Sequence, residues 1–130
     1  PVQDFISDAD GGNLIGRTEE YAAMSRELLE KGQEALRQGD LVQVSEKLWG
    51  AAAQMVKAVA ERRGWPHSSH RELFQVVSRL AQEPGDPGVR NFFQVANSLH
   101  NNFYENWKTR EYLEDGIGQV RELISRLERV

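Results

Sequence analysis

The sequence predicts an all-α domain, folded as an antiparallel up-and-down bundle of four long helices and one short helix. Three observations lead to this prediction. Apolar residues recur every three or four positions over most of the 130 residues, which is the spacing of one face of an α-helix. No segment of useful length alternates apolar and polar residues, so we expect no β-sheet. The connections between the helical segments are short, and short connections make consecutive helices antiparallel neighbours.

The first 17 residues lack this spacing. The run from Asp8 to Asn13 is rich in Asp and Gly, which are typical of turns. We therefore expect residues 1–17 to form a poorly patterned N-terminal arm. Residues 18–130 are expected to form a single helical bundle domain, a length that suits one hydrophobic core.

The first two predicted helices form a hairpin. Thr18 is placed to cap the first helix, and Gly39 is placed to end it. Asp40 follows at once as the cap of a second helix, which runs from about Leu41 to Arg63. So short a connection predicts that the two helices are antiparallel and adjacent.

The second helix carries two apolar stripes, which predicts that it is covered on more than one side. The small residues from Gly50 to Ala53 are expected to let another helix come close. The stripes are Leu41, Val44, Leu48, Ala51, Met55 and Val59, and beside them Val42, Trp49, Ala52 and Val56.

Three further helices complete the bundle. Ser69 and Glu72 form a capping box that opens a short third helix, and a Pro- and Gly-rich loop over residues 83–88 follows it. The fourth helix is expected from about Val89 to Trp107. Thr109 is then placed to cap the fifth helix, whose apolar stripe is Leu113, Ile117, Val120, Ile124 and Leu127.

The fourth helix also carries two stripes. The first is expected to face the core and consists of Phe92, Ala96, Leu99 and Phe103. The second is aromatic at both ends and polar in the middle, and consists of Phe93, Asn97, His100, Tyr104 and Trp107, with Asn101 beside it. This face is a helix-packing surface, a dimer interface, or a site where His100 titrates near neutral pH and hydrogen-bonds a ligand.

Basic residues gather around the end of the second helix. They surround Trp65 and are Lys57, Arg62, Arg63, His67, His70 and Arg71. Basic residues beside an aromatic ring are typical of nucleic-acid contacts. Because Glu61 and Glu72 dilute the group and the chain is acidic overall, a solvated helix end is the favoured interpretation.

Composition narrows the function classes. The net charge of −4 argues against a general polyanion binder, and the absence of cysteine excludes disulfides and thiolate chemistry. His67 and His70 lack a third ligand nearby, so we expect no metal and no cofactor. The sequence has no long apolar run and no signal peptide at Pro1, so we expect a cytoplasmic protein without membrane contact.

Several segments resemble a known family. They are residues 45–52, 57–60, 63–65 and 98–107, the last of which reads Ser-Leu-His-Asn-Asn-Phe-Tyr-Glu-Asn-Trp. Residues 18–130 resemble the PaREP-type archaeal proteins, which belong to the HEPN superfamily (higher eukaryotes and prokaryotes nucleotide-binding). The resemblance implies a helical bundle that is commonly a homodimer. It also implies a role with RNA, in toxin–antitoxin or defence systems, in some cases beside a nucleotidyltransferase partner.

The nuclease members of that superfamily carry an arginine and a histidine on a late helix, with four to six residues between them. In this chain only the histidine, His100, matches, because nine residues separate it from Arg90. The missing guanidinium would have held the scissile phosphate. We therefore expect a non-catalytic module that binds RNA, a nucleotide or a partner.

Two alternatives stay open. One is a ribonuclease centred on His100, in which Lys47, Lys57 or Arg90 replaces the missing arginine. The other is a purely structural or assembly protein. Apart from the basic residues around Trp65, the candidate ligand-binding residues are Asn97, His100, Asn101, Tyr104, Trp107, Lys47 and Lys57.

Overall fold

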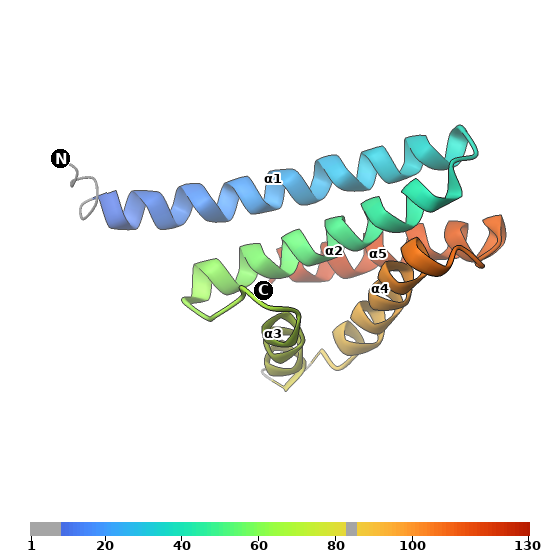
Figure 1. Ribbon diagram of the computed structural model, residues 1–130. Coiled ribbons are helices and arrows are strands. Elements are labelled where there is room, and N and C mark those ends of the chain that lie inside the picture. The colour runs from blue at the N-terminus through green and yellow to red at the C-terminus, as the bar shows by residue number, and fades with distance from the viewer. Residues whose placement is uncertain (1–8, 83–85) are drawn as a thin grey trace.

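The computed structural model describes residues 9–82 and 86–130, with side chains from residue 16 onward. The described residues form five helices and no strand, which confirms the predicted all-α bundle (Figure 1). The helices are α1 (Ala9–Arg37), α2 (Leu41–Arg63), α3 (His70–Gln82), α4 (Gly88–Glu105) and α5 (Arg110–Glu128). None of the described helices combines the length and the apolar character needed to cross a membrane.

Helix α2 is the centre of the bundle, since it packs against each of the other four helices. In Figure 1, α1 runs alongside α2, and α5 lies behind it, while α3 and α4 lie below. The prediction that α2 is covered on more than one side is confirmed, because residues from both of its stripes are buried. They include Val44, Leu48, Ala51, Ala52, Met55, Val56 and Val59.

Several helix ends are set by the local signals that the sequence carries. The side chain of Asp40 accepts a hydrogen bond from the backbone N–H of Gln43 at 3.3 Å. Gly39 and Gly64 adopt left-handed φ angles of 79° and 75°, which glycine reaches without the penalty a Cβ brings. The predicted capping box is also confirmed, because Glu72 N–H donates to Ser69 Oγ at 3.1 Å and Ser69 N–H donates to Glu72 Oε1 at 3.3 Å.

Small residues set the spacing between helices. A Cβ added at Gly50 would lie 3.0 Å from Leu28 of α1, and one added at Gly116 would lie 3.3 Å from two methyl groups of Leu99. At Gly32 the nearest atom is a methyl group of Leu48, at 3.1 Å. The expected close approach at Gly50 is therefore present, between α1 and α2.

The predicted start of the first helix is wrong. Helix α1 begins at Ala9, so residues 9–13, predicted as a turn, are helical, and the arm expected over residues 1–17 is helical from residue 9. Residues 1–8 lie outside the described residues. Thr18 lies inside the helix and is buried, and its hydroxyl caps nothing. Tertiary context commonly overrides local turn preference, and beyond this segment Arg17 pairs with Glu61 of α2, a contact between distant positions that no local pattern contains.

Two predictions about α4 are also wrong. The helix ends at Glu105 rather than Trp107, because Asn106 adopts a left-handed φ of 52°. The core face is rotated, since Phe93 is fully buried while Phe92 and Phe103 are only half-buried. Phe93 packs edge-on against Phe74 of α3 with ring centroids 4.8 Å apart, so contact with α3 selects it for the core.

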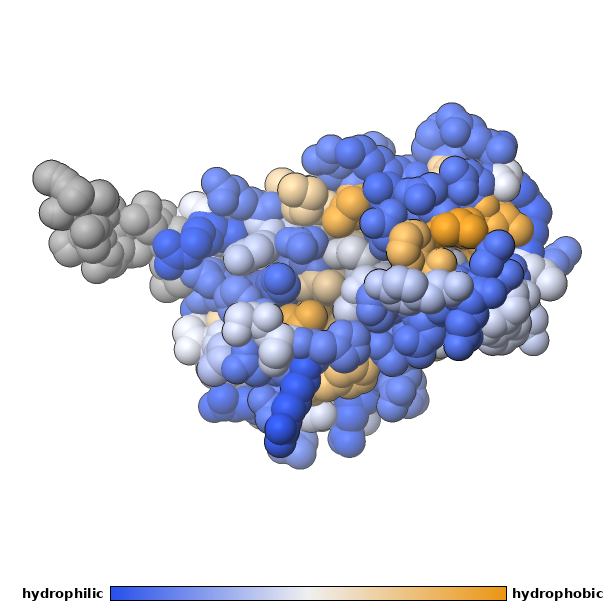
Figure 2. All heavy atoms as spheres, viewed as in Figure 1, coloured by the Kyte–Doolittle hydropathy of each residue, from blue (hydrophilic) through white to orange (hydrophobic). Residues whose placement is uncertain are grey.

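The surface that faces the viewer in Figure 2 is mostly hydrophilic. Its apolar areas are small and separated from one another. Scattered patches of this size are ordinary for a folded domain. A candidate site is therefore better sought among grooves and unpaired polar groups than in surface hydrophobicity.

Candidate functional site

A groove of about 260 Å³ runs between α2 and the segment that joins α2 to α3. Trp49, Ala53 and Lys57 recur every four residues and line it from one face of α2. His67 and His70 line it from the other side, together with the two serines between them. The groove thus brings Trp49, predicted as part of an apolar stripe, together with His67 and His70, which were predicted as part of the basic group.

Three flat rings meet at one end of this groove. Trp49 stacks on His100 with ring centroids 4.9 Å apart and an interplanar angle of 29°. His70 lies 5.2 Å from Trp49 and 5.7 Å from His100, again between centroids. Trp49 and His100 are half-buried and His70 is exposed, so the three rings form a platform at the surface. We call Trp49, His70 and His100 the ring cluster.

The polar edges of the ring cluster differ in their partners. The Nε2 atom of His70 lies 2.9 Å from Asn97 Oδ1, which fixes the orientation of both side chains. Among the described residues, none makes a hydrogen bond to the imidazole of His100. Burial, followed by the nearby charge of His70, lowers the pKa of His100 below its ordinary value of 6.5. The lowered pKa favours the neutral imidazole of His100.

This lowered pKa predicts a pH-dependent stability. In the unfolded chain His100 binds its proton near pH 6.5, whereas the folded state binds it only at lower pH. The folded state is therefore not destabilised by His100 above pH 6.5. It loses stability as the pH falls through 6.5 toward the lower pKa of His100 in the folded state. We expect the free energy of unfolding, measured by urea titration, to decrease between pH 7 and pH 5.

The variant His100→Gln provides the control, because glutamine has no proton to gain. It should remove part of that decrease, while Glu61 and Glu72, whose lowered pKa values start from 4.5, act only at more acidic pH. An identical pH slope in the wild-type chain and in His100→Gln would contradict the prediction.

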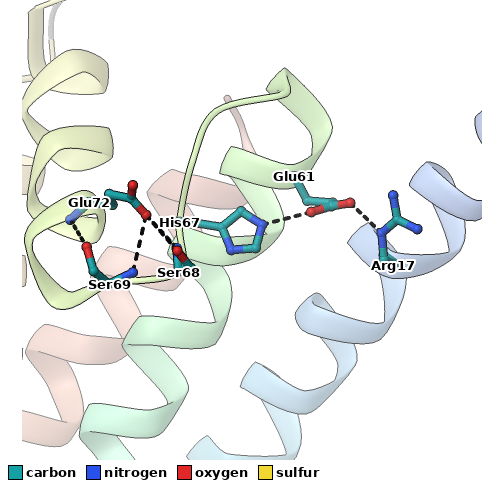
Figure 3. A network of polar contacts seen from close by, with 6 residues as sticks. All are labelled: Arg17, Glu61, His67, Ser68, Ser69 and Glu72. Carbon is teal, nitrogen blue, oxygen red and sulfur yellow. Dashed lines mark hydrogen bonds and ion pairs between the residues drawn. The ribbon is translucent and has the colours of Figure 1, made fainter.

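A polar network holds the groove wall in place (Figure 3). His67 Nε2 lies 2.8 Å from Glu61 Oε1, and the same carboxylate pairs with Arg17 of α1 at 2.5 Å. The hydrogen bond from His67, with a smaller contribution from Arg17, lowers the pKa of Glu61. The edge of the Tyr21 ring contacts the imidazole of His67, with centroids 5.5 Å apart. The wall of the groove is thus tied to both α1 and α2.

The three cations expected near His100 are placed differently. Lys57 lines the groove and forms no ion pair with any residue that the structure describes. Lys47 lies on the α1 side of α2, since its Cβ is near Gly32 and its Nζ is 3.7 Å from Glu46. Arg90 is exposed and precedes His100 by ten residues, which is roughly 15 Å along a helix. Lys57 is therefore the cation best placed to meet an anion in the groove.

The basic residues around Trp65 do not form one patch. The guanidinium groups of Arg63 and Arg79 lie over the ring of Trp65, at 5.2 and 4.1 Å from its centre. Trp65 also lines a separate hollow of about 70 Å³. Arg62 and Arg71 are exposed. Of the predicted group, only Lys57, His67 and His70 line the groove.

The other residues predicted on the polar and aromatic face of the fourth helix do not all lie near His100. Tyr104 contacts His100 edge-on, with centroids 5.6 Å apart, and is 73% exposed. Asn101 is exposed as well. Trp107 lies beyond the end of α4, where it contacts Tyr112 instead.

Two important residues were missed by sequence reasoning. Trp49, taken as part of a packing stripe, is the ring on which both imidazoles rest. Asn102 is fully buried and donates from Nδ2 to Ser45 Oγ at 2.7 Å. Its Oδ1 accepts from the backbone N–H groups of Trp107 and Lys108, at 2.8 and 2.9 Å. The available signal was Ser45, a polar residue between apolar positions of α2.

Comparisons with known proteins support the fold and the resemblance. The chain is similar to a crystal structure of a protein from Sulfolobus solfataricus, with a TM-score of 0.74 and 21% sequence identity. The similarity covers 82% of this chain and 94% of that chain, and at this identity it shows the fold alone. No curated protein matches the chain. A family model described as the archaeal PaREP1/PaREP8 family matches residues 20–124. Since this match spans most of the helical domain, the chain belongs to the archaeal PaREP1/PaREP8 family.

Proposed function

We propose that the chain is a HEPN-like module that binds single-stranded RNA or a nucleotide in the groove beside Trp49, without cleaving it. The observation that carries the proposal is the ring cluster at one end of the groove, combined with Lys57 farther along α2, which pairs with none of the described residues. Flat rings stack on nucleobases of any sequence, and a nearby cation meets the phosphate. The groove, of about 260 Å³, is smaller than the roughly 300–1,000 Å³ of pockets that enclose a whole ligand, so we expect it to hold only part of a nucleotide.

The polar edges of the cluster support this assignment. The lowered pKa favours the neutral imidazole of His100, whose ring offers one donor and one acceptor, and no described residue makes a hydrogen bond to either. An exposed imidazole at His70, fixed by Asn97, adds a second ring for stacking. These groups suit the edge of a base, which presents both donors and acceptors, because the neutral imidazole of His100 presents both as well.

The test is binding of a fluorescein-labelled single-stranded RNA, followed by anisotropy at several salt concentrations. Stacking is worth about 1–3 kcal/mol per base, so His70→Ala or His100→Ala should weaken binding roughly 5- to 100-fold. Lys57→Gln should weaken binding and reduce the salt slope by about one unit.

Matched controls are available on exposed positions. Asn101→Ala changes an exposed neighbour of His100, and Lys31→Gln removes a lysine of α1 that is paired with Glu27 at 3.1 Å. Both should leave RNA affinity unchanged. The proposal fails when neither RNA nor nucleotides bind, or when the ring-cluster variants bind as tightly as the controls.

A second candidate function is metal-independent RNA cleavage. The observation that favours it is the pair of imidazoles at His70 and His100, whose ring centroids are 5.7 Å apart near Lys57. One imidazole would take the proton of the attacking 2′-hydroxyl, and the other would protonate the departing 5′-oxygen. Cleavage in the presence of a chelator, abolished by His70→Ala and by His100→Ala, would establish it. Intact RNA, or cleavage that survives both variants, contradicts it.

The homodimer and the nucleotidyltransferase partner implied by the family resemblance stay predictions. Light scattering at micromolar concentration measures the first. A purely structural role requires self-assembly, so a monomer in that measurement would also remove this alternative.

A further inference from the structure

A second groove, of about 220 Å³, lies between α4 and α5. Ser98 lines it from α4, on a flank roughly opposite His100 because successive helix residues turn by about 100°. Leu99 and Gly116 form its floor, where a Cβ at Gly116 would come within 3.3 Å of the leucine methyl groups. Because Gly116 has no side chain, α4 and α5 approach each other closely at this apolar floor.

The rim of this groove carries one cation and one anion that do not neutralise each other. Lys108 and Asp115 both line the groove, and neither forms an ion pair with a residue in the described part of the chain. The ammonium of Lys108 lies instead 4.4 Å from the ring centre of Trp107 and 5.3 Å from that of Tyr112. Unpaired opposite charges on one small groove suit a ligand with hydrogen-bond donors on one edge and acceptors on the next.

Aromatic rings stand beside these charges. Tyr112 lines the groove and Trp107 contacts Tyr112, and each of the two side chains is 59% exposed. Exposed rings at the mouth of a groove favour a flat ligand that stacks on them. A small zwitterion such as an amino acid would satisfy the two charges but would leave the rings unused.

We propose that the groove between α4 and α5 binds a guanine base, with Asp115 and Lys108 reading its two adjacent edges. The carboxylate of Asp115 accepts from N1–H and the N2 amino group, and the ammonium of Lys108 donates to O6 or N7. Adenine would turn its N1 acceptor toward the carboxylate, so the same groove rejects it by repulsion. Tyr112 supplies the stacking surface with the face of its ring that Lys108 does not cover.

This inference does not depend on the groove beside Trp49, since the two sites share no residue. The guanine comes either from a free nucleotide or from a G-containing RNA. The experiment therefore titrates the full chain with GMP, AMP, CMP and UMP, and then with hexanucleotides that contain or lack guanine. Amide chemical shifts in NMR spectra report which site each ligand occupies.

GMP, or the guanine-containing hexanucleotide, should shift the amides of residues 108–119 and bind at least about tenfold tighter than its adenine counterpart. Asp115→Asn should reduce that preference at least about fivefold. Glu114→Gln is the matched control, because Glu114 is paired with Arg110 at 3.3 Å and does not line the groove.

His100→Ala should leave the guanine-induced shifts unchanged, which separates this site from the ring cluster. Circular dichroism of each variant confirms that it is folded. Equal binding of all four nucleotides, displacement of GMP by free amino acids, or a guanine preference that survives Asp115→Asn would overturn the proposal, as would binding of neither guanine ligand.

Discussion

Replacing Leu48 by alanine should lower the free energy of unfolding by about 3–5 kcal/mol. Leu48 is fully buried on the central helix, and its methyl groups face Gly32 of α1 and Gly116 of α5. Neither glycine carries a side chain that could move into the space, so the cavity would collapse only partially. For a domain of this size the loss is a large part of a total stability of roughly 5–15 kcal/mol.

Chemical denaturation followed by circular dichroism measures this loss. The variant Leu48→Met keeps the volume and should cost less than about 1.5 kcal/mol. Met24, which is 46% exposed, provides a surface control, since Met24→Ala should change stability by less than about 0.5 kcal/mol. A loss at Leu48→Ala no greater than at Met24→Ala would mean that the three helices do not meet around this side chain.

Replacing Asn102 by alanine should cost about 2–4 kcal/mol, although the side chain is polar. Its amide joins Ser45 of α2 to the backbone of Trp107 and Lys108, so three hydrogen bonds are lost together. The hydroxyl of Ser45 is fully buried, and without its partner it loses a hydrogen bond that water cannot easily replace.

The neighbouring Asn101 gives the matched control, because it is exposed and its truncation should cost less than about 0.5 kcal/mol. A double-mutant cycle with Ser45→Ala isolates the coupling of the pair, expected at about 0.5–3 kcal/mol. Additive effects of the two substitutions, or equal costs at positions 101 and 102, would show that the amide does not hold α4 to α2.

The parts of the fold that could be predicted from the sequence are those with local signals. Asp40, Gly64 and the Ser69–Glu72 capping box each fix a helix end through contacts within a few residues, so local patterns suffice. The start of α1 was not predictable in this way, because residues 9–13 carry turn chemistry, while the nearby Arg17 makes its ion pair with Glu61, 44 positions away.

The rotation of α4 shows a second kind of limit. Phe92 and Phe93 are adjacent and equally apolar, so periodicity alone does not decide which of them enters the core. The decision comes from Phe74 on α3, and no local pattern contains that information. The same holds for the ring cluster, whose members Trp49, His70 and His100 come from three helices and meet only after packing.

The three-residue connection between α1 and α2 has a consequence for how the chain reaches its native state. A short loop costs little entropy to close, so the first two helices are able to pair early, even while later segments are still being made on the ribosome. At that stage Val44 and Leu48 belong to a hairpin whose second side has no cover, because α4 and α5 do not yet exist. During that interval the apolar side chains of α2 that later pack on α4 and α5 would be exposed to solvent, and this side of the helix would be prone to aggregation.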